Sequence, residues 1–224
     1  EVMTVQGNMS KKDARKCAEY LFEVVGLEAK RLSAYPHQLS GGMRQRCMIA
    51  MSLALEPDLI IADEPTTALD VVVQDRILRK IKELQRESNI SLMFVTHDIS
   101  VVAEICEKTM VMYAGQIAEA GSTREIFKSP YHPYTLGLIN AFPNVIEDIP
   151  QLISIPGYPP DLTQPLQGCR FSPRCPFSQD LCHQKEPEQH EVEPGHFVAC
   201  HFTEKVDQFR SLSSLESTWK EVTA

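Results

Sequence analysis

The chain has 224 residues, and its 22 Lys and Arg against 30 Asp and Glu give a formal net charge of -8 at pH 7. A chain of this length can bury one full hydrophobic core and a second, smaller one. The acidic balance argues against nucleic acid as the main partner, but it leaves nucleotide binding open because backbone amides can hold phosphate. No apolar run reaches the roughly 18 residues that a membrane span needs, and the first residues contain no signal-peptide core.

The beginning of the chain predicts a small helical subdomain. Apolar residues recur at helical spacing over residues 10–29, with Ser10 as a candidate N-cap and Gly26 as a candidate stop. A short link then leads to Leu39 and a second helical pattern.

This second helix is expected to run from its N-cap, Ser40, to about Leu55. Gly41 and Gly42 follow the cap, and without Cβ atoms they let the backbone approach a ligand where free amides and the helix dipole favour an anion. A glycine-containing cap without a ligand is the plainer interpretation. The predicted buried stripe comprises Met43, Cys47, Ala50, Met51 and Ala54, whereas Arg44, Gln45 and Arg46 are expected to face outward or sideways.

Two apolar strands are predicted to end in residues with reactive side chains. The run 59–62 is typical of a parallel strand covered on both faces, and Asp63 and Glu64 follow at its carboxyl end. A second strand over 90–95 leads to His97, which we expect at the same crevice. Asp63 can serve Mg²⁺, and Glu64 can polarise an attacking water.

The remaining elements of this part follow from local signals. Asp70 is a candidate N-cap for a helix over 71–88, a role that is compatible with one at an interface. The core positions of that helix are expected at Val73, Ile77, Ile81 and Leu84. Asp98 is a candidate cap for the next helix, and Ala114-Gly115 predicts a hairpin. Ser122 and Glu125 form a predicted capping box, and a further helix is expected to begin at Pro133 and end before Pro143.

The C-terminal part differs in composition. Most of the 15 prolines lie between residues 143 and 194, and four of the seven cysteines, Cys169, Cys175, Cys182 and Cys200, lie in or beside that segment. Four thiols suit an iron–sulfur cluster or tetrahedral zinc equally, and reduced thiols without metal are the third possibility. His183, His196 and His201 are weaker candidate ligands, while Cys17, Cys47 and Cys106 are expected to pack as small apolar residues. A strand over 152–155 and a polar tail, either a loose helix or disordered, complete the expectations.

Together these residues resemble the ATP-binding subunits of ABC transporters. The segment LSGGM at 39–43 resembles their signature motif, LIIADE at 59–64 the Walker B motif, TALD at 67–70 the D-loop, and His97 the switch histidine. Order and spacing match from about Ser33 to Asp98. Met43 in place of the more usual Gln, HPYT at 132–135 and CRFSPRCP at 169–176 resemble the dipeptide/oligopeptide importer branch.

The resemblance implies a role for each site residue. Ser40, Gly41 and Gly42 would contact the γ-phosphate of a nucleotide held mainly by a partner ATPase subunit, and Asp70 would connect the two sites across the dimer. Asp63 would serve the Mg²⁺ site, Glu64 would be the general base, and His97 would contact the γ-phosphate of the subunit's own nucleotide. A [4Fe-4S] cluster would be held by Cys169, Cys175, Cys182 and Cys200.

The implied fold is α/β, a partial P-loop NTPase (ABC ATPase) domain over residues 1–142, followed by a small irregular Cys/Pro-rich module over 143–205 and a tail over 206–224. Within the first domain, residues 1–55 would be the helical subdomain and 56–142 the catalytic part. One necessary motif is missing: none of the ten glycines is followed by Lys, so there is no Walker A loop. We therefore expect that the chain lacks an N-terminal portion and by itself hydrolyses no ATP.

The implied function is ATP hydrolysis, with Mg²⁺, that drives a dipeptide/oligopeptide importer from the cytoplasmic face of the membrane. The implied partners are a second ABC ATPase subunit, two transmembrane permease subunits and, indirectly, a peptide-binding protein. One alternative is a soluble ABC ATPase that acts on ribosomes or DNA, which the acidic charge disfavours. Another is a non-catalytic metal-binding or redox-sensing module with a decayed ATPase domain, which intact Asp63, Glu64 and His97 disfavour.

Overall fold

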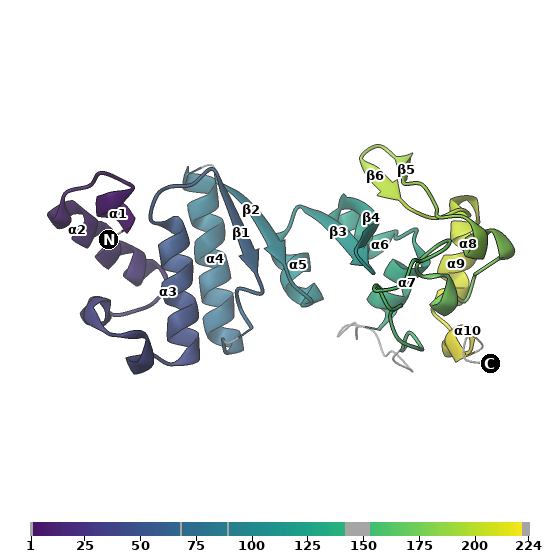
Figure 1. Ribbon diagram of the computed structural model, residues 1–224, viewed down its shortest axis with the longest axis horizontal. Coiled ribbons are helices and arrows are strands. Elements are labelled where there is room, and N and C mark those ends of the chain that lie inside the picture. The colour runs from purple at the N-terminus through teal and green to yellow at the C-terminus, as the bar shows by residue number, and fades with distance from the viewer. Residues whose placement is uncertain (1, 68, 89, 142–152, 221–224) are drawn as a thin grey trace. The chain divides into compact units, whose positions relative to one another are not determined.

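A computed structural model describes residues 2–67, 69–88, 90–141 and 153–220 (Figure 1). The chain forms two compact units, residues 1–105 and 106–224. The domain limit predicted after residue 142 lies outside the described residues and stays a prediction. Among the helices that the structure describes, none combines the length and the apolar character needed to cross a bilayer.

The first unit contains mostly helices around one small sheet. Its elements are α1 (Val2–Val5), α2 (Lys11–Val24), the 3₁₀ turns η1 (Ala29–Ser33) and η2 (Pro36–Gln38), α3 (Gly41–Leu53), β1 (Leu59–Asp63), α4 (Val71–Ser88), β2 (Ser91–Val95) and α5 (Ile99–Ile105). The predicted caps are confirmed. Ser10 accepts a hydrogen bond from the Asp13 amide, Ser40 accepts one from the Met43 amide, and Gly26 ends the α2 segment with a φ of +68°.

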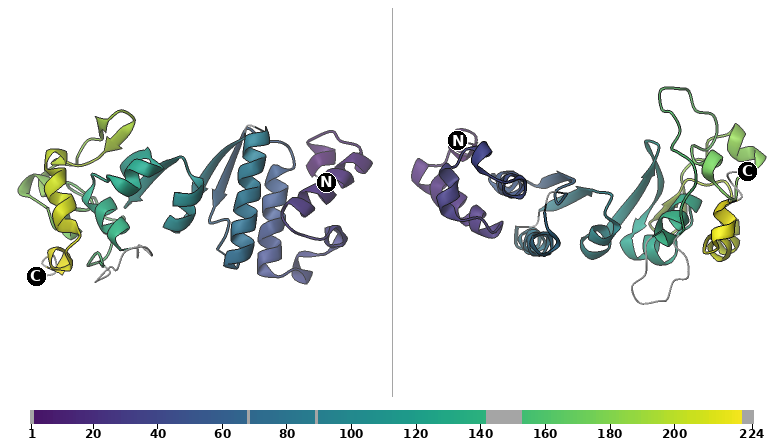
Figure 2. Two further views of the ribbon diagram at one scale, coloured as in Figure 1. Left: turned by 180° about the vertical axis from the view of Figure 1, so that it is seen from behind. Right: turned by 90° about the horizontal axis from the view of Figure 1, so that it is seen from below.

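The two strands of this unit pair in parallel, as the sequence predicts. Their register runs from Leu59 opposite Ser91 to Asp63 opposite Val95. Helices α3 and α4 lie side by side next to these strands (Figures 1 and 2). The parallel register sets the carboxyl ends of β1 and β2 at the same edge of the sheet.

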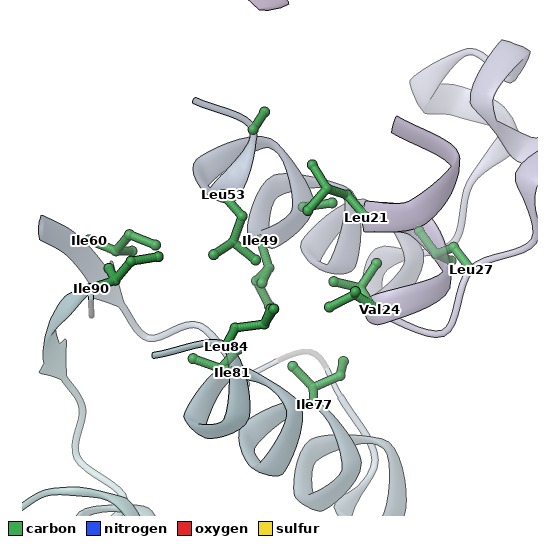
Figure 3. Close-up of a cluster of buried hydrophobic side chains, with 13 residues drawn as sticks. Leu21, Val24, Leu27, Ile49, Leu53, Ile60, Ile77, Ile81, Leu84 and Ile90 are labelled. Atoms are coloured by element: carbon green, nitrogen blue, oxygen red, sulfur yellow. The ribbon is translucent and has the colours of Figure 1, made fainter. Parts of the chain in front are cut away.

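One hydrophobic cluster joins α2, α3, α4 and the strands (Figure 3). Its buried members are Leu21, Val24, Val25, Leu27, Ile49, Ala50, Leu53, Ala54, Ile60, Ile77, Ile81, Leu84 and Ile90. The predicted α4 core positions are confirmed, with Val73 packed at the edge of the cluster. The predicted α3 stripe is wrong at Met51, which is 62% exposed, because Ile49 and Leu53 occupy the face that meets the cluster.

The β1–β2 sheet is covered on one face only within the described chain. Ile60 is buried in the cluster, while its neighbours Leu59 and Ile61 are 53% and 64% exposed. Met93 and Val95 of β2 are exposed as well. The prediction that both faces of this strand are covered is therefore wrong for this structure, because side chains alternate between the two faces of a strand and only one face meets the cluster.

The second unit is built on a four-stranded sheet in the order β3-β4-β6-β5. Its elements are β3 (Lys108–Tyr113), β4 (Gln116–Ser122), α6 (Thr123–Lys128), α7 (Pro133–Asn140), η3 (Ser172–Arg174), α8 (Asp180–Gln184), β5 (His190–Glu193), β6 (His196–Val198), η4 (Thr203–Lys205), α9 (Val206–Ser213) and α10 (Glu216–Lys220). The predicted hairpin is confirmed, with positive φ angles at Ala114 and Gly115. The Ser122–Glu125 capping box and the helix start at Pro133 are confirmed too.

The hairpin β5–β6 was not predicted, and it changes how the C-terminal part is built. Strand β6 pairs with β4, with Glu119 opposite Val198, so the cysteine-containing segment shares a sheet with β3 and β4. The predicted strand over 152–155 is wrong at residues 153–155, which form no strand, and Leu152 lies outside the described residues.

The polar tail is folded, so disorder, one of the two expectations for it, is wrong over Val206–Lys220. Trp219 is 1% exposed and its indole N–H donates to the Ser213 carbonyl over 2.9 Å. The ring lies against Gly137 in α7, where an added Cβ would come within 2.5 Å of Trp219. The tail therefore folds because its one Trp fills a space that only a glycine leaves open.

We predict that Trp219→Ala lowers the free energy of unfolding of the second unit by about 3–5 kcal/mol, because it empties a large buried site. Urea unfolding followed by circular dichroism measures this, since the variant has lost the only Trp. Leu215→Ala, at a residue that is 50% exposed, is the control and should cost about 1 kcal/mol or less. Equal losses in the two variants would show that Trp219 is not an anchor.

Candidate functional site

The carboxyl ends of β1 and β2 bring Glu64 and His97 into contact, as the sequence predicts. The imidazole Nδ1 of His97 lies 2.7 Å from Oε1 of Glu64. The backbone N–H of His97 donates to the same oxygen over 3.1 Å. Two residues 33 positions apart thus form one polar pair at the edge of the sheet.

Glu64 is held in an unusual backbone conformation. Its φ of +46° lies in the left-handed region, which costs free energy for residues other than glycine. The Glu64 N–H donates to the Val95 carbonyl over 2.8 Å, which continues the pairing of β1 with β2. The Thr67 hydroxyl donates to Oε2 over 2.9 Å, so hydrogen bonds hold both carboxylate oxygens.

The pair shifts the pKa of each partner. The hydrogen bond from His97, helped by that from Thr67, lowers the pKa of Glu64 below its ordinary range. The carboxylate in turn raises the pKa of His97. The Glu64 side chain is 37% exposed and that of His97 80%. Glu64 is therefore an ionised, water-accessible carboxylate at neutral pH.

The other predicted residues of the first unit lie at strand and helix ends. Asp63 is the exposed last residue of β1. Ser40 caps α3, and the space beside Gly41 is open, since an added Cβ there would meet no atom within 4 Å. Asp70 accepts a hydrogen bond from the Val73 amide over 2.9 Å, which confirms it as the N-cap of α4. The helix start at Ser40 and Gly41 suits anion binding, and the strand end at Asp63 suits cation binding.

Gln45 is a site residue that the sequence patterns did not indicate. Its side-chain amide donates to the Pro65 carbonyl over 2.9 Å and to the Glu64 carbonyl over 3.4 Å. It was expected to face outward or sideways because helical periodicity reports burial and not specific hydrogen bonds. Thr67 was missed for a different reason, because its contact with Glu64 depends on the conformation of the turn.

The second unit brings the four C-terminal cysteines to one cavity. Cys169, Cys175, Cys182 and Cys200 line it together with aromatic rings that include Phe171, Phe177 and Phe209. Cys182 lies in α8, and its carbonyl accepts a hydrogen bond from the Cys169 amide over 2.7 Å. His201 lines the same cavity. The predicted grouping of the four thiols thus has a structural counterpart.

All three weaker candidate ligands have other partners, and for His201 the ring nitrogen Nε2 lies 2.8 Å from the Lys185 carbonyl oxygen. The His183 ring nitrogen Nε2 lies 3.1 Å from the Ser178 hydroxyl. His196 is fully buried, and its Nε2 lies 2.7 Å from Oε1 of Glu119. Neither His183 nor His196 is among the residues that line the cysteine cavity.

Burial controls the ionisation of the cavity thiols. It raises the pKa of Cys169, raises that of Cys175 strongly, and raises the pKa of Cys200 to about 12. These thiols are therefore protonated at neutral pH unless a cation stabilises the thiolates. Within the described ranges, no three or more Cys, His, Asp or Glu side chains are arranged to hold a single metal ion.

Comparison with known proteins gives two family matches. Residues 1–67 match the family described as "ABC transporter", and residues 118–182 match "Oligopeptide/dipeptide transporter, C-terminal region". The first match includes Ser40, Asp63 and Glu64, and the second includes three of the four cavity cysteines.

Curated relatives carry names that agree with these matches. The chain is 46% identical to a probable peptide ABC transporter ATP-binding protein of Sinorhizobium fredii, over 89% of this chain and 61% of that protein. It is 47% identical to the oligopeptide transport ATP-binding protein OppD of Escherichia coli, over 89% and 60%. The dipeptide transport ATP-binding protein DppD of Bacillus subtilis is 46% identical, over 89% and 60%.

The chain thus spans about 60% of the length of the curated relatives it matches. The motifs, the Glu64–His97 geometry and the two family matches agree with one another. By these two matches and the curated relatives, the chain is similar to the ATP-binding proteins of ABC transporters, in the oligopeptide/dipeptide branch.

Proposed function

We propose that this chain is part of the ATP-hydrolysing subunit of an ABC importer for dipeptides or oligopeptides. The observation that carries the proposal is the contact between Glu64 and His97 at the carboxyl ends of two parallel strands, directly beside Asp63. An ionised carboxylate at this edge can orient and activate a water, and a histidine beside it can contact a phosphate. The names of the relatives supply the transport role.

Each residue takes a role in this proposal. Glu64 is the general base for the attacking water, Asp63 serves Mg²⁺, and His97 contacts the γ-phosphate of the same site. The helix start at Ser40, Gly41 and Gly42 contacts the γ-phosphate of a nucleotide on a second ATPase subunit. Asp70, which caps α4, connects the two sites across the dimer in this proposal.

The proposal includes an assembly. A second ABC ATPase subunit, identical or related, completes two ATP sites. The two ATPase subunits close on ATP and part after hydrolysis, and two transmembrane permease subunits receive this motion. A peptide-binding protein delivers the cargo, and the ATPase sits peripherally at the cytoplasmic face of the membrane. In domain terms we propose a partial P-loop NTPase domain over 1–142 and a small irregular Cys/Pro-rich module over 143–205, with a terminal segment over 206–224.

We predict that Glu64→Gln lowers the ATP turnover of the complete subunit, assembled with its partners, by about 10² to 10⁴-fold, the usual contribution of a general base. Nucleotide affinity should change little. Phosphate release under saturating ATP measures the rate. The matched control is Glu83→Gln, since Glu83 is 59% exposed on α4 in a pair with Lys80. Turnover that survives Glu64→Gln would refute the proposed role, as would equal losses in both variants.

The Glu64–His97 pair gives a prediction for pH. The lowered pKa of Glu64 means that its contribution to stability is present above the ordinary value of 4.5 and is lost as pH falls through the folded-state value. The raised pKa of His97 means that its contribution is present below the ordinary value of 6.5 and is lost as pH rises through the folded-state value. The pair therefore stabilises the fold fully between 4.5 and 6.5.

We predict that the His97 imidazole of the 224-residue chain titrates above pH 6.5, and that Glu64→Gln returns it toward that value. Proton NMR of the imidazole signals measures the titration, and a His97→Gln sample identifies the His97 signal among the seven histidines. A His97 pKa that is the same with and without the Glu64 carboxylate would contradict the pairing.

We also propose that Cys169, Cys175, Cys182 and Cys200 hold a [4Fe-4S] cluster, with zinc as the alternative. The support is chemical: four thiols line one cavity with an apolar wall. Four thiolates around one zinc ion at 2.3 Å would lie about 3.8 Å apart, and the described thiols form no such single-ion group. A [4Fe-4S] cluster would be held by one thiolate at each of its irons. Its charge would also stabilise the thiolates against the effect of burial.

We predict that the chain, reconstituted anaerobically with iron and sulfide, turns brown and binds about four irons per chain. Cys200→Ser should lower bound iron and destabilise the second unit, while Cys17→Ser, which changes a cysteine packed on the core of the first unit, should not. Iron, sulfide and zinc analysis with unfolding curves measures both effects. A colourless protein with one zinc per chain would favour the alternative.

A further inference from the structure

Gln45 connects the helix that begins at the signature motif to the residue proposed as the general base. It lies three residues after Gly42, in the second turn of α3, and its side chain is partly buried. Both of its hydrogen bonds are directed at the turn after β1: one to the Pro65 carbonyl at 2.9 Å, the other to the Glu64 carbonyl at 3.4 Å. The bond therefore spans two segments that are about 20 residues apart in sequence.

The turn that Gln45 contacts needs outside support. Glu64 has a left-handed φ of +46°, a conformation that a residue with a Cβ keeps only where its surroundings enforce it. On the side-chain side, His97 and Thr67 hold the carboxylate. On the main-chain side, the Glu64 N–H donates to the Val95 carbonyl of β2, and Gln45 adds a contact from α3 to the carbonyl oxygens of the turn.

We propose that Gln45 is a positioning residue that fixes the Glu64–Pro65 turn to α3, so that the start of this helix and the Glu64 carboxylate are set as one unit. This inference rests on the proposed function, because it assigns Gln45 a role in placing the proposed base. Gln45 would then link two sites, because Ser40–Gly42 face the nucleotide of the partner subunit while Glu64 faces the nucleotide of its own subunit. Binding at the helix start then acts on the base through one side chain.

The experiment removes the two hydrogen bonds of Gln45 and keeps the volume of its side chain. Gln45→Met has a similar length and helix propensity but cannot donate to a carbonyl. The control is Gln85→Met, a partly buried glutamine in α4 away from the turn. We expect kcat of the complete subunit, assembled with its partners, to fall about 10- to 100-fold in Gln45→Met, because small displacements of a reacting group have effects of this size. The KM for ATP should stay within about twofold, since the chemical step and not binding is affected.

A second measurement tests the contact without turnover. In the 224-residue chain, Gln45→Met should move the NMR titration of His97 toward its ordinary pKa, because a displaced Glu64 no longer reaches the imidazole. Gln85→Met should leave the titration unchanged. A merely structural role for Gln45 would lower the unfolding midpoint and leave this titration where it is.

The outcomes separate the two proposals. If Glu64→Gln abolishes turnover while Gln45→Met keeps kcat within twofold and leaves the His97 titration unchanged, the positioning role is wrong and the proposed function stands. If Glu64→Gln leaves turnover intact, the proposed function fails, and the His97 titration alone decides whether Gln45 positions the turn. Loss of kcat together with a shifted titration supports both.

Discussion

The parallel pairing of β1 with β2 is the constraint on which the candidate site depends. The pairing places Asp63 beside Val95, so the residues that follow both strands meet at one edge. The pairing itself is held by the cluster that α2, α3 and α4 form on one face of the sheet. An apolar core at some distance from the chemistry thus sets the 2.7 Å contact between Glu64 and His97.

Much of the first unit could be predicted because its determinants are local. Helix caps such as Ser10, Ser40 and Asp70 depend on contacts over three residues, and their sequence signals were sufficient. The meeting of Glu64 with His97 followed from a general rule for parallel sheets. Features that depend on long-range packing were missed or wrong: the exposure of Met51, the uncovered face of β1 and the contact of Gln45 with the Glu64 turn.

In the second unit, too, local features could be predicted from the sequence and long-range contacts could not. The hairpin around Ala114 and the capping box at Ser122 were predicted from short motifs, whereas the pairing of β6 with β4 was not. That pairing is stabilised by a buried carboxylate. Glu119 accepts hydrogen bonds from the amides of Tyr131 and His132 and contacts His196 at 2.7 Å. One acidic side chain thereby joins β4, β6 and the start of α7, and no sequence pattern reports such a long-range contact.

The backbone of Glu64 has a consequence for how this segment tolerates change. Glycine adopts a left-handed φ at a lower cost in free energy than other residues. A Glu64→Gly replacement would therefore relax the turn and at the same time remove the carboxylate. Two effects on stability therefore oppose each other at this position, because glycine would relax the backbone while glutamate keeps the hydrogen bonds from His97 and Thr67. A screen for thermal stability sees only the balance of these two effects and not the loss of the carboxylate, so a stabilised variant of this protein should be checked at this residue before any other.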